Sequence, residues 1–191
     1  KAAHSSCLAF DGRVGKYIHT STGSVYVETG LRREKSFDPY LHNIVMGDRD
    51  DFDYGEGKRQ AEAVYFQKSR FPVVAMRIPI VLGEDDYTQR LEFHIHKIKQ
   101  GESLVVPNLE SKTTFIHSEE TARFMEWLGT ENIQGPINGC SNGVISIQEI
   151  IAMIEEAVAK KANVIHEGNE KDYTSFTDQF SRMNDNTLAK E

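Results

Sequence analysis

Residues 54 to 79 decide the fold, and they read Tyr-Gly-Glu-Gly-Lys-Arg-Gln-Ala-Glu-Ala-Val-Tyr-Phe-Gln-Lys-Ser-Arg-Phe-Pro-Val-Val-Ala-Met-Arg-Ile-Pro. In the first part, helix-favouring residues separate the positions that recur at helical spacing, which are Lys58, Ala61, Val64 and Tyr65. The second part, from Phe71 to Pro79, is a nearly continuous apolar run, which is typical of a parallel strand covered on both faces. A helix followed by a buried strand is half of a β-α-β unit. The stretch therefore predicts an α/β fold.

The rest of the chain continues this alternation of strands and helices. Ser118 is expected to be the N-cap of a helix over 119–128, and Ser146 and Glu149 have the spacing of a capping box at the start of another helix. Apolar residues show no sustained period over residues 28–53, which indicates a loop with room for one helical turn. The other predicted elements are strands near 17–20, 104–107, 113–117 and 136–138, and a helix around 91–98. This order favours a largely parallel sheet.

Composition excludes several classes of protein. The chain has 191 residues, 39% of them hydrophobic, which is enough for an ordinary core, and its net charge of −7 disfavours binding to nucleic acid. Two cysteines without CxxC spacing predict neither a disulfide framework nor a zinc cluster, and a cytoplasmic location fits them. No apolar run reaches the ~18 residues of a membrane span, so we expect no membrane partner.

Tyr54 and Lys58 are the first candidates for chemistry. They lie four residues apart, so a helix places the phenol and the ammonium on the same face. A cation at that distance favours the phenolate and lowers the pKa of the tyrosine from its reference near 10, which suits proton transfer. A Tyr and a Lys at this spacing also occur by chance on a solvent-exposed helix face, where they have no catalytic role. Context has to separate the two interpretations.

The context consists of ordered blocks that surround the pair. They are Thr20-Ser-Thr-Gly-Ser-Val-Tyr26, Arg77-Ile-Pro-Ile-Val-Leu-Gly83, Thr114-Phe-Ile-His-Ser-Glu-Glu-Thr-Ala122 and Pro136-Ile-Asn-Gly139. With Tyr54-Gly-Glu-Gly-Lys58, they make the chain resemble the extended short-chain dehydrogenase/reductases, the NAD-dependent epimerase/dehydratase family, including its atypical members. The resemblance implies a Rossmann-type parallel sheet with a small mixed α/β substrate subdomain.

The same resemblance implies a division of the chain. Residues 1–83 would be the back half of the NAD(P)-binding Rossmann domain. Residues 84–191 would mainly form the substrate-binding subdomain, with 119–140 returning to the Rossmann domain. The sequence contains no G-x-x-G-x-x-G, the phosphate-binding turn with which this family opens. The family's first strands are therefore expected before Lys1, and the Rossmann sheet of these residues is expected to be incomplete.

Roles for individual residues follow from the resemblance. Tyr54 would be the catalytic acid/base, Lys58 would lower its pKa and bind the nicotinamide ribose, and Thr22 would bind the substrate oxygen. The remaining residues implied at the NAD or NADP site are Thr20, Ser21, Ile78, Pro79 and Val81. The residues implied at the substrate are Ser24, Ile80 and Lys112. No metal site is expected.

Three departures from the family pattern bear on the substrate. Ile80 stands where sugar-nucleotide epimerases tend to carry Asn, and Thr113 stands where they carry an Arg that grips the diphosphate. Lys112 offers a point charge in its place rather than a bidentate fork. Gly23 and Ser24 replace the acidic pair of sugar-nucleotide dehydratases, which disfavours dehydration of a deoxysugar precursor.

The sequence thus supports two hypotheses. The first is an NAD(P)-dependent oxidoreductase or isomerase, an epimerase/dehydratase or reductase that acts on a hydroxyl or carbonyl of a small molecule such as a sugar nucleotide, and that forms a homodimer. The alternative is a non-catalytic NAD(P)-sensing or scaffold protein of the same fold. His94 and His96 lie two apart on a helix and point to different faces, so packing or surface roles are expected for them. The acidic residues between Asp48 and Asp53 are expected to form a solvated loop.

Overall fold

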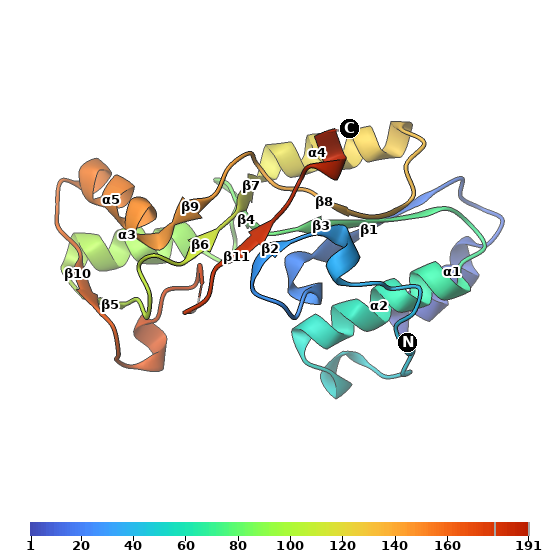
Figure 1. The fold of residues 1–191 in the computed structure, drawn as a ribbon, viewed down its shortest axis with the longest axis horizontal. Helices are drawn as coiled ribbons and strands as arrows, with labels where there is room; N and C mark the ends of the chain where they lie inside the picture. The colour runs from blue at the N-terminus through green and yellow to red at the C-terminus, as the bar shows by residue number, and fades with distance from the viewer. Residues whose placement is uncertain (178, 191) are drawn as a thin grey trace.

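A parallel three-stranded sheet forms the centre of the computed structural model, which describes residues 1–177 and 179–190. Its strands are β1 (Tyr17–Thr22), β3 (Val73–Ile78) and β8 (Gly135–Asn138), in the order β1-β3-β8. Helices α1 (Ala2–Phe10) and α2 (Tyr54–Lys68) cover one face, and α4 (Ser118–Thr130) covers the other (Figure 1). This layered arrangement confirms the predicted α/β class and its parallel strands.

The central strand β3 is buried along its whole length, as its apolar run predicts. Val74, Met76 and Ile78 pack with Leu128 of α4 and Ile137 of β8. Val73 turns the other way and packs with Cys7, Val64 and Tyr65 between α1 and α2. Alternate residues of one strand therefore supply two separate cores, which is why both faces of the sheet need a helical cover.

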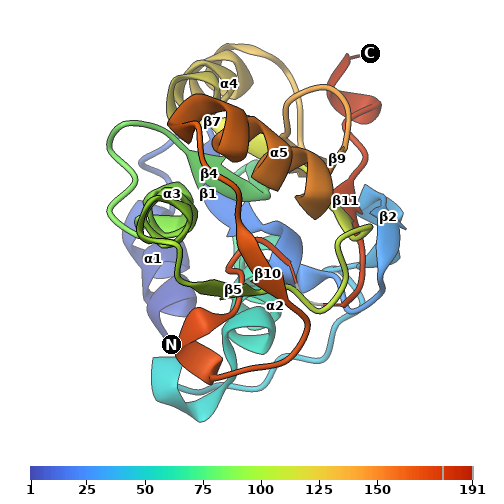
Figure 2. The ribbon, with the colours of Figure 1, turned by 90° about the vertical axis from the view of Figure 1, so that its left-hand side faces the viewer.

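A third core lies beyond Pro79. This residue separates β3 from β4 (Ile80–Leu82), which pairs in parallel with β7 (Phe115–His117). Helices α3 (Arg90–Gln100) and α5 (Ile147–Val158) enclose the core together with the parallel pair β5 (Ser103–Val105) and β10 (Asn163–Ile165) (Figure 2). The core contains Ile98, Leu104, Val106, Ile147, Ile150, Ile151, Ile154 and Phe176.

A small mixed sheet joins distant parts of the chain. It consists of β2 (Gly30–Arg32), β11 (Arg182–Asn184), β6 (Lys112–Thr113) and β9 (Ile145–Ser146), in the order β2-β11-β6-β9. The prediction of a loop over 28–53 missed β2, because a three-residue strand is too short to show a period. Short 3₁₀ turns cover Gly23–Val25, Glu34–Ser36, Arg49–Asp51, Glu170–Asp172 and Leu188–Lys190.

Two helices begin at or beside the predicted N-cap residues. Ser146 accepts a hydrogen bond from the Glu149 backbone N–H at 3.2 Å, which confirms the predicted capping box of α5. The prediction of Ser118 as the N-cap of α4 is wrong by one residue. His117 is the cap, and its Nδ1 accepts the Glu119 N–H at 3.3 Å. No helix in the described part of the chain has the length and apolar character needed to cross a membrane.

Candidate active site

Helix α2 places Tyr54 and Lys58 beside the end of β1. The Asp53 side chain caps the helix by accepting the Glu56 N–H at 2.7 Å, so Tyr54 is the first helical residue. Lys58 reaches across to β1 and donates to the Thr20 carbonyl at 3.1 Å. Its ammonium lies 5.8 Å from the centre of the Tyr54 ring. The ammonium is partly buried, and this burial lowers the pKa of Lys58.

Thr22 is the last residue of β1 and holds the turn that faces the start of α2. Its Oγ1 accepts the Ser24 backbone N–H at 3.2 Å. Gly55 makes this approach possible, because a Cβ there would lie 2.8 Å from the Ser24 carbonyl oxygen. The close contact of helix and turn brings Thr22 and Tyr54 to one cavity although 32 positions separate them in the sequence (54 − 22).

This cavity, which we call the active-site cavity, has a volume of about 440 Å³. It lies at the carboxyl ends of β1 and β3, where ligands of parallel α/β sheets usually bind. Every site residue predicted from the sequence lines it except Lys112. These lining residues are Thr20, Ser21, Thr22, Ser24, Tyr54, Lys58, Ile78, Pro79, Ile80 and Val81. The structure brings them together, and their individual roles stay predictions.

Lys112 lies outside the lining of the cavity. Its side chain is exposed, while its backbone N–H donates to Ser181 Oγ at 2.9 Å. The neighbouring Thr113 is buried and does line the cavity. Other lining residues were not predicted, because they come from segments far apart in the chain and show no common spacing. They are Arg32, Asp86, Tyr87, Thr88, Arg90, Phe176, Arg182 and Asn184.

A buried ion pair lies one helical turn beyond Lys58. Glu62 and Arg77 both have side chains of 0% exposure, with Arg77 Nη2 and Glu62 Oε2 2.6 Å apart. Glu62 Oε1 also accepts the Ser21 hydroxyl at 2.5 Å and Arg77 Nε at 3.1 Å. Because Ser21 and Arg77 are paired in register on β1 and β3, one carboxylate fixes α2 to both strands directly below the cavity.

Hydrogen bonds continue from Arg77 to the small mixed sheet. Arg77 Nη1 donates to the Tyr26 hydroxyl at 3.2 Å, and that hydroxyl donates to Asn138 Oδ1 at 2.6 Å. Asn138 Nδ2 then donates to the carbonyls of Arg32 and Asp185 at 3.0 and 2.9 Å. Burial raises the pKa of Tyr26 to about 12, so this phenol stays protonated. The helix with Tyr54 and the strands with Arg32 and Arg182 thus share one polar network.

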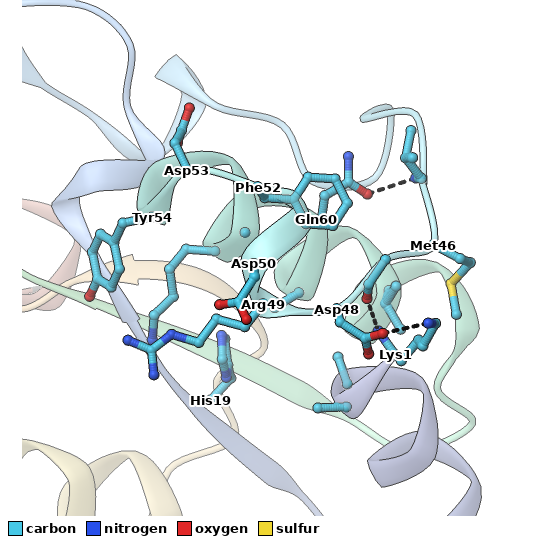
Figure 3. A pocket seen from close by; sticks show the side chains of 18 residues that line it. Lys1, His19, Met46, Asp48, Arg49, Asp50, Phe52, Asp53, Tyr54 and Gln60 are labelled. Carbon is cyan, nitrogen blue, oxygen red and sulfur yellow. Dashed lines mark hydrogen bonds and ion pairs between the residues drawn. The ribbon is translucent and has the colours of Figure 1, made fainter.

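A second cavity of about 850 Å³ lies on the other side of Tyr54 and Lys58, which line both cavities. Figure 3 shows Tyr54, Arg49 and His19 at one end of it and the ion pair of Lys1 with Asp48 at the other. His19 Nε2 is buried and has no hydrogen-bond partner among the described residues. Burial and the nearby Lys58 charge lower the pKa of His19 to about 4, so its ring is neutral at pH 7.

Comparisons with solved structures identify this architecture. The chain is 22% identical to the UDP-glucuronic acid 4-epimerase from Bacillus cereus in complex with NAD, with a TM-score of 0.72. It is 16% identical to the dTDP-4-dehydrorhamnose reductase from Bacillus anthracis in complex with NADP, with a TM-score of 0.69. It is 17% identical to the enzyme WbmG from Bordetella bronchiseptica in complex with NAD and UDP, with a TM-score of 0.74.

Each match covers 98% of this chain but only 56%, 63% and 56% of the three neighbours, in that order. The chain therefore spans less than two thirds of their length. At these identities the likeness shows the fold, which is the Rossmann-type fold of NAD(P)-dependent epimerases and reductases, as the sequence predicts. No protein-family model matches the sequence, and no curated protein sequence matches it.

Proposed function

We propose that the protein is an NAD(P)-dependent epimerase or reductase of the extended short-chain dehydrogenase/reductase family, acting on a hydroxyl or carbonyl of a small molecule. The observation that carries the proposal is the gathering of Thr22, Tyr54 and Lys58 around one cavity at the carboxyl ends of β1 and β3. The fold shared with the epimerase and reductase neighbours supports it. Fold alone does not define a reaction, so the side chains have to supply the chemistry.

In the proposed reaction Tyr54 moves a proton to or from the substrate oxygen. Tyr54 is 63% exposed at the edge of the cavity, so its hydroxyl is accessible to a substrate. Lys58 stabilises the phenolate that remains when Tyr54 has given up its proton. The Thr22 hydroxyl donates a hydrogen bond to the same substrate oxygen and so orients the substrate.

The residues around Lys58 fit a nicotinamide cofactor. Lys58 presents its ammonium between the two cavities, the hydroxyls of Thr20 and Thr22 are close by, and Ile78, Pro79 and Val81 provide an apolar wall. His19 adds a buried ring nitrogen on the side of the second cavity. NAD(P) supplies hydride transfer when it is bound. The roles of these residues are to hold the ribose and to exclude water from the nicotinamide end.

Charge in the active-site cavity supports an anionic substrate, for which we propose a sugar nucleotide. Four cationic side chains line the cavity, and the one carboxylate among its described lining residues is Asp86. The net charge of the whole chain is −7, so the excess of positive charge in this cavity is opposite in sign to the net charge of the protein. The four cations are Arg32, Lys58, Arg90 and Arg182. Guanidinium groups match phosphate oxygens in pairs, so we assign the diphosphate to Arg90 and Arg182 rather than to Lys112.

We also propose that the protein forms a homodimer through its exposed apolar surface. Leu8 of α1 is 69% exposed, and Phe10 at the end of the same helix is 37% exposed. Size-exclusion chromatography with light scattering should give twice the monomer mass, and a monomer at micromolar concentration would contradict the proposal.

The test of the proposed function is Tyr54→Phe, which removes one hydroxyl and keeps the ring. The full-length protein and its Tyr54→Phe variant are incubated with NADH or NADPH and with a panel of sugar nucleotides and carbonyl compounds. We expect the variant to lose at least about a hundredfold in kcat, the usual contribution of a positioned acid/base. Tyr87→Phe is the matched control, because Tyr87 is 93% exposed at the same cavity and is given no role in the proposed proton transfer.

Three outcomes are informative. Equal turnover by the Tyr54→Phe variant would remove Tyr54 from the chemistry. Cofactor binding without turnover of any substrate would favour the non-catalytic sensing or scaffold protein. Loss of turnover in both tyrosine variants would indicate a shared effect on folding or binding, which circular dichroism and cofactor titration would separate.

A further inference from the structure

His94 is fully buried on α3 and is held at both ring nitrogens. Nδ1 lies 2.7 Å from the Arg90 carbonyl oxygen, and Nε2 lies 2.8 Å from Thr174 Oγ1. Because a carbonyl oxygen only accepts, Nδ1 carries the proton, and Nε2 of the neutral ring accepts the Thr174 hydroxyl. Burial lowers the pKa of His94, which keeps the ring in this neutral form at pH 7. The histidine therefore connects α3 to a segment that follows 80 residues later (174 − 94).

The ring of His94 also stacks on Phe176. The two ring centres are 4.2 Å apart and the planes are nearly parallel, at 3°. Phe115 of β7 also contacts Phe176, edge-on, with the ring centres 5.2 Å apart. Phe176 in turn lines the active-site cavity. One wall of that cavity therefore lies directly on the buried histidine.

A second anchor lies one helical turn further along α3. Lys97 forms an ion pair with Asp172 at 2.5 Å, and both side chains are 12% exposed. Side chains of this segment are alternately buried and exposed: Asp172, Thr174 and Phe176 are buried, and Tyr173 and Ser175 are exposed. Every second side chain of the segment therefore packs against the rest of the protein. The Thr174 backbone N–H donates to the Val105 carbonyl at 2.9 Å. In Figure 1 this segment is the orange-red chain that follows β10.

We infer that His94 is a positioning residue for the substrate end of the active-site cavity, and this inference rests on the proposed function. His94 and Lys97 hold residues 172–176 against α3, and the segment presents Phe176 to the cavity. Phe176 has no group that transfers a proton, so its placement affects substrate affinity and leaves the proton transfer at Tyr54 unchanged. We call these contacts of His94 and Lys97 with residues 172–176 the clamp. Loss of the clamp should therefore raise KM and leave kcat unchanged.

The experiment compares His94→Gln with His96→Gln in the full-length protein. His96 lies on the same helix with its side chain exposed, so it is the matched control. The first measurement is limited digestion with trypsin, because Lys171 and Arg182 flank the clamped segment. We expect His94→Gln to speed cleavage after Lys171 about tenfold, since the locally open state that trypsin can cleave becomes more populated when these contacts weaken. His96→Gln should be cleaved at the rate of the unchanged protein.

The second measurement is steady-state kinetics on a sugar nucleotide that the unchanged protein turns over. We expect His94→Gln to raise KM about tenfold, the effect of losing roughly 1.4 kcal/mol of binding, with kcat within about twofold. Faster cleavage with an unchanged KM would overturn the inference while the proposed function stands. If no substrate is turned over, the proposed function fails, and the trypsin result still decides whether the clamp exists.

Thr174→Val is a second route to the same result if His94→Gln does not fold. Valine keeps the shape of threonine and removes the hydroxyl that His94 Nε2 accepts. We expect faster cleavage after Lys171 with a normal circular dichroism spectrum. A cleavage rate equal to that of the unchanged protein in both Thr174→Val and His94→Gln would refute the clamp.

Discussion

Replacing Glu62 by Gln should destabilise the protein more than any surface substitution, because it leaves a buried cation without its counter-ion. Glu62 and Arg77 both have 0% exposed side chains, and their closest approach is 2.6 Å. Glutamine keeps one oxygen for the Ser21 hydroxyl, so the local shape is preserved. What is lost is the negative charge and the second carboxylate oxygen that Arg77 uses.

The structure sets the size of this effect. Removing one partner of a buried ion pair typically costs about 3–5 kcal/mol. Arg77 keeps neutral acceptors in the carbonyls of Glu34 and Phe37, at 2.8 and 3.1 Å, and in the Tyr26 hydroxyl at 3.2 Å. The lower end of the range therefore applies, and we expect a loss of about 3 kcal/mol. For a chain of this length, that corresponds to a fall in Tm of roughly 6–12 °C.

The assay is urea unfolding followed by the fluorescence of Trp127, the single tryptophan of the chain. Glu119→Gln is the control, because Glu119 and Arg123 form an ion pair at 3.2 Å with 74% and 71% of their side chains exposed. Exposed pairs contribute at most about 1 kcal/mol, so the control should unfold close to the unchanged protein. The double variant Glu62→Leu/Arg77→Met removes both charges and should recover most of the loss.

Refutation would come from a Glu62→Gln variant that unfolds within about 1 kcal/mol of the unchanged protein. That result would mean that the carbonyls, together with the rings of Tyr26 and Phe37 whose centres each lie 5.1 Å from the guanidinium carbon, solvate the Arg77 charge on their own. A double variant less stable than Glu62→Gln would also contradict the reasoning, because it would assign the loss to packing and not to the unpaired charge.

Two further predictions concern pH and the cofactor. The pKa of His19 is about 4 in the folded protein and near 6.5 when unfolded, so its contribution to stability is complete above pH 6.5 and is lost as the pH falls toward 4. The loss should reach about 3 kcal/mol, and a His19→Leu variant whose urea midpoint falls as steeply between pH 7 and pH 4 would contradict this assignment. A chain of residues 1–191 should bind NADH with a Kd in the millimolar range or weaker, since these residues include no glycine-rich phosphate-binding turn. Calorimetric titration checks this, and a Kd of a few micromolar would show that other residues hold the pyrophosphate.

Sequence alone predicted the elements whose patterns are local. Helix α2 follows from the helical spacing of Lys58, Ala61, Val64 and Tyr65 with helix-favouring residues between them, and β3 follows from its nearly continuous apolar run. The position of Tyr54 relative to Lys58 is also a local property, because four residues always make about one turn of a helix. The resemblance added Thr22 and the residues from Ile78 to Val81, all of which line the same cavity.

The tertiary structure decided which distant side chains meet. Arg77 looked like one polar residue in an apolar strand, and only the packing of α2 on β1 and β3 shows that Glu62 neutralises it. Arg90 and Arg182 reach the active-site cavity from a helix and a three-residue strand, while the predicted Lys112 does not. His94 meets Phe176 across 82 positions (176 − 94). The physical reason is that the apolar periods of helices and strands depend on neighbours within about four residues, whereas these contacts depend on how complete elements pack. Strands of two or three residues are also too short to show an apolar period in the sequence.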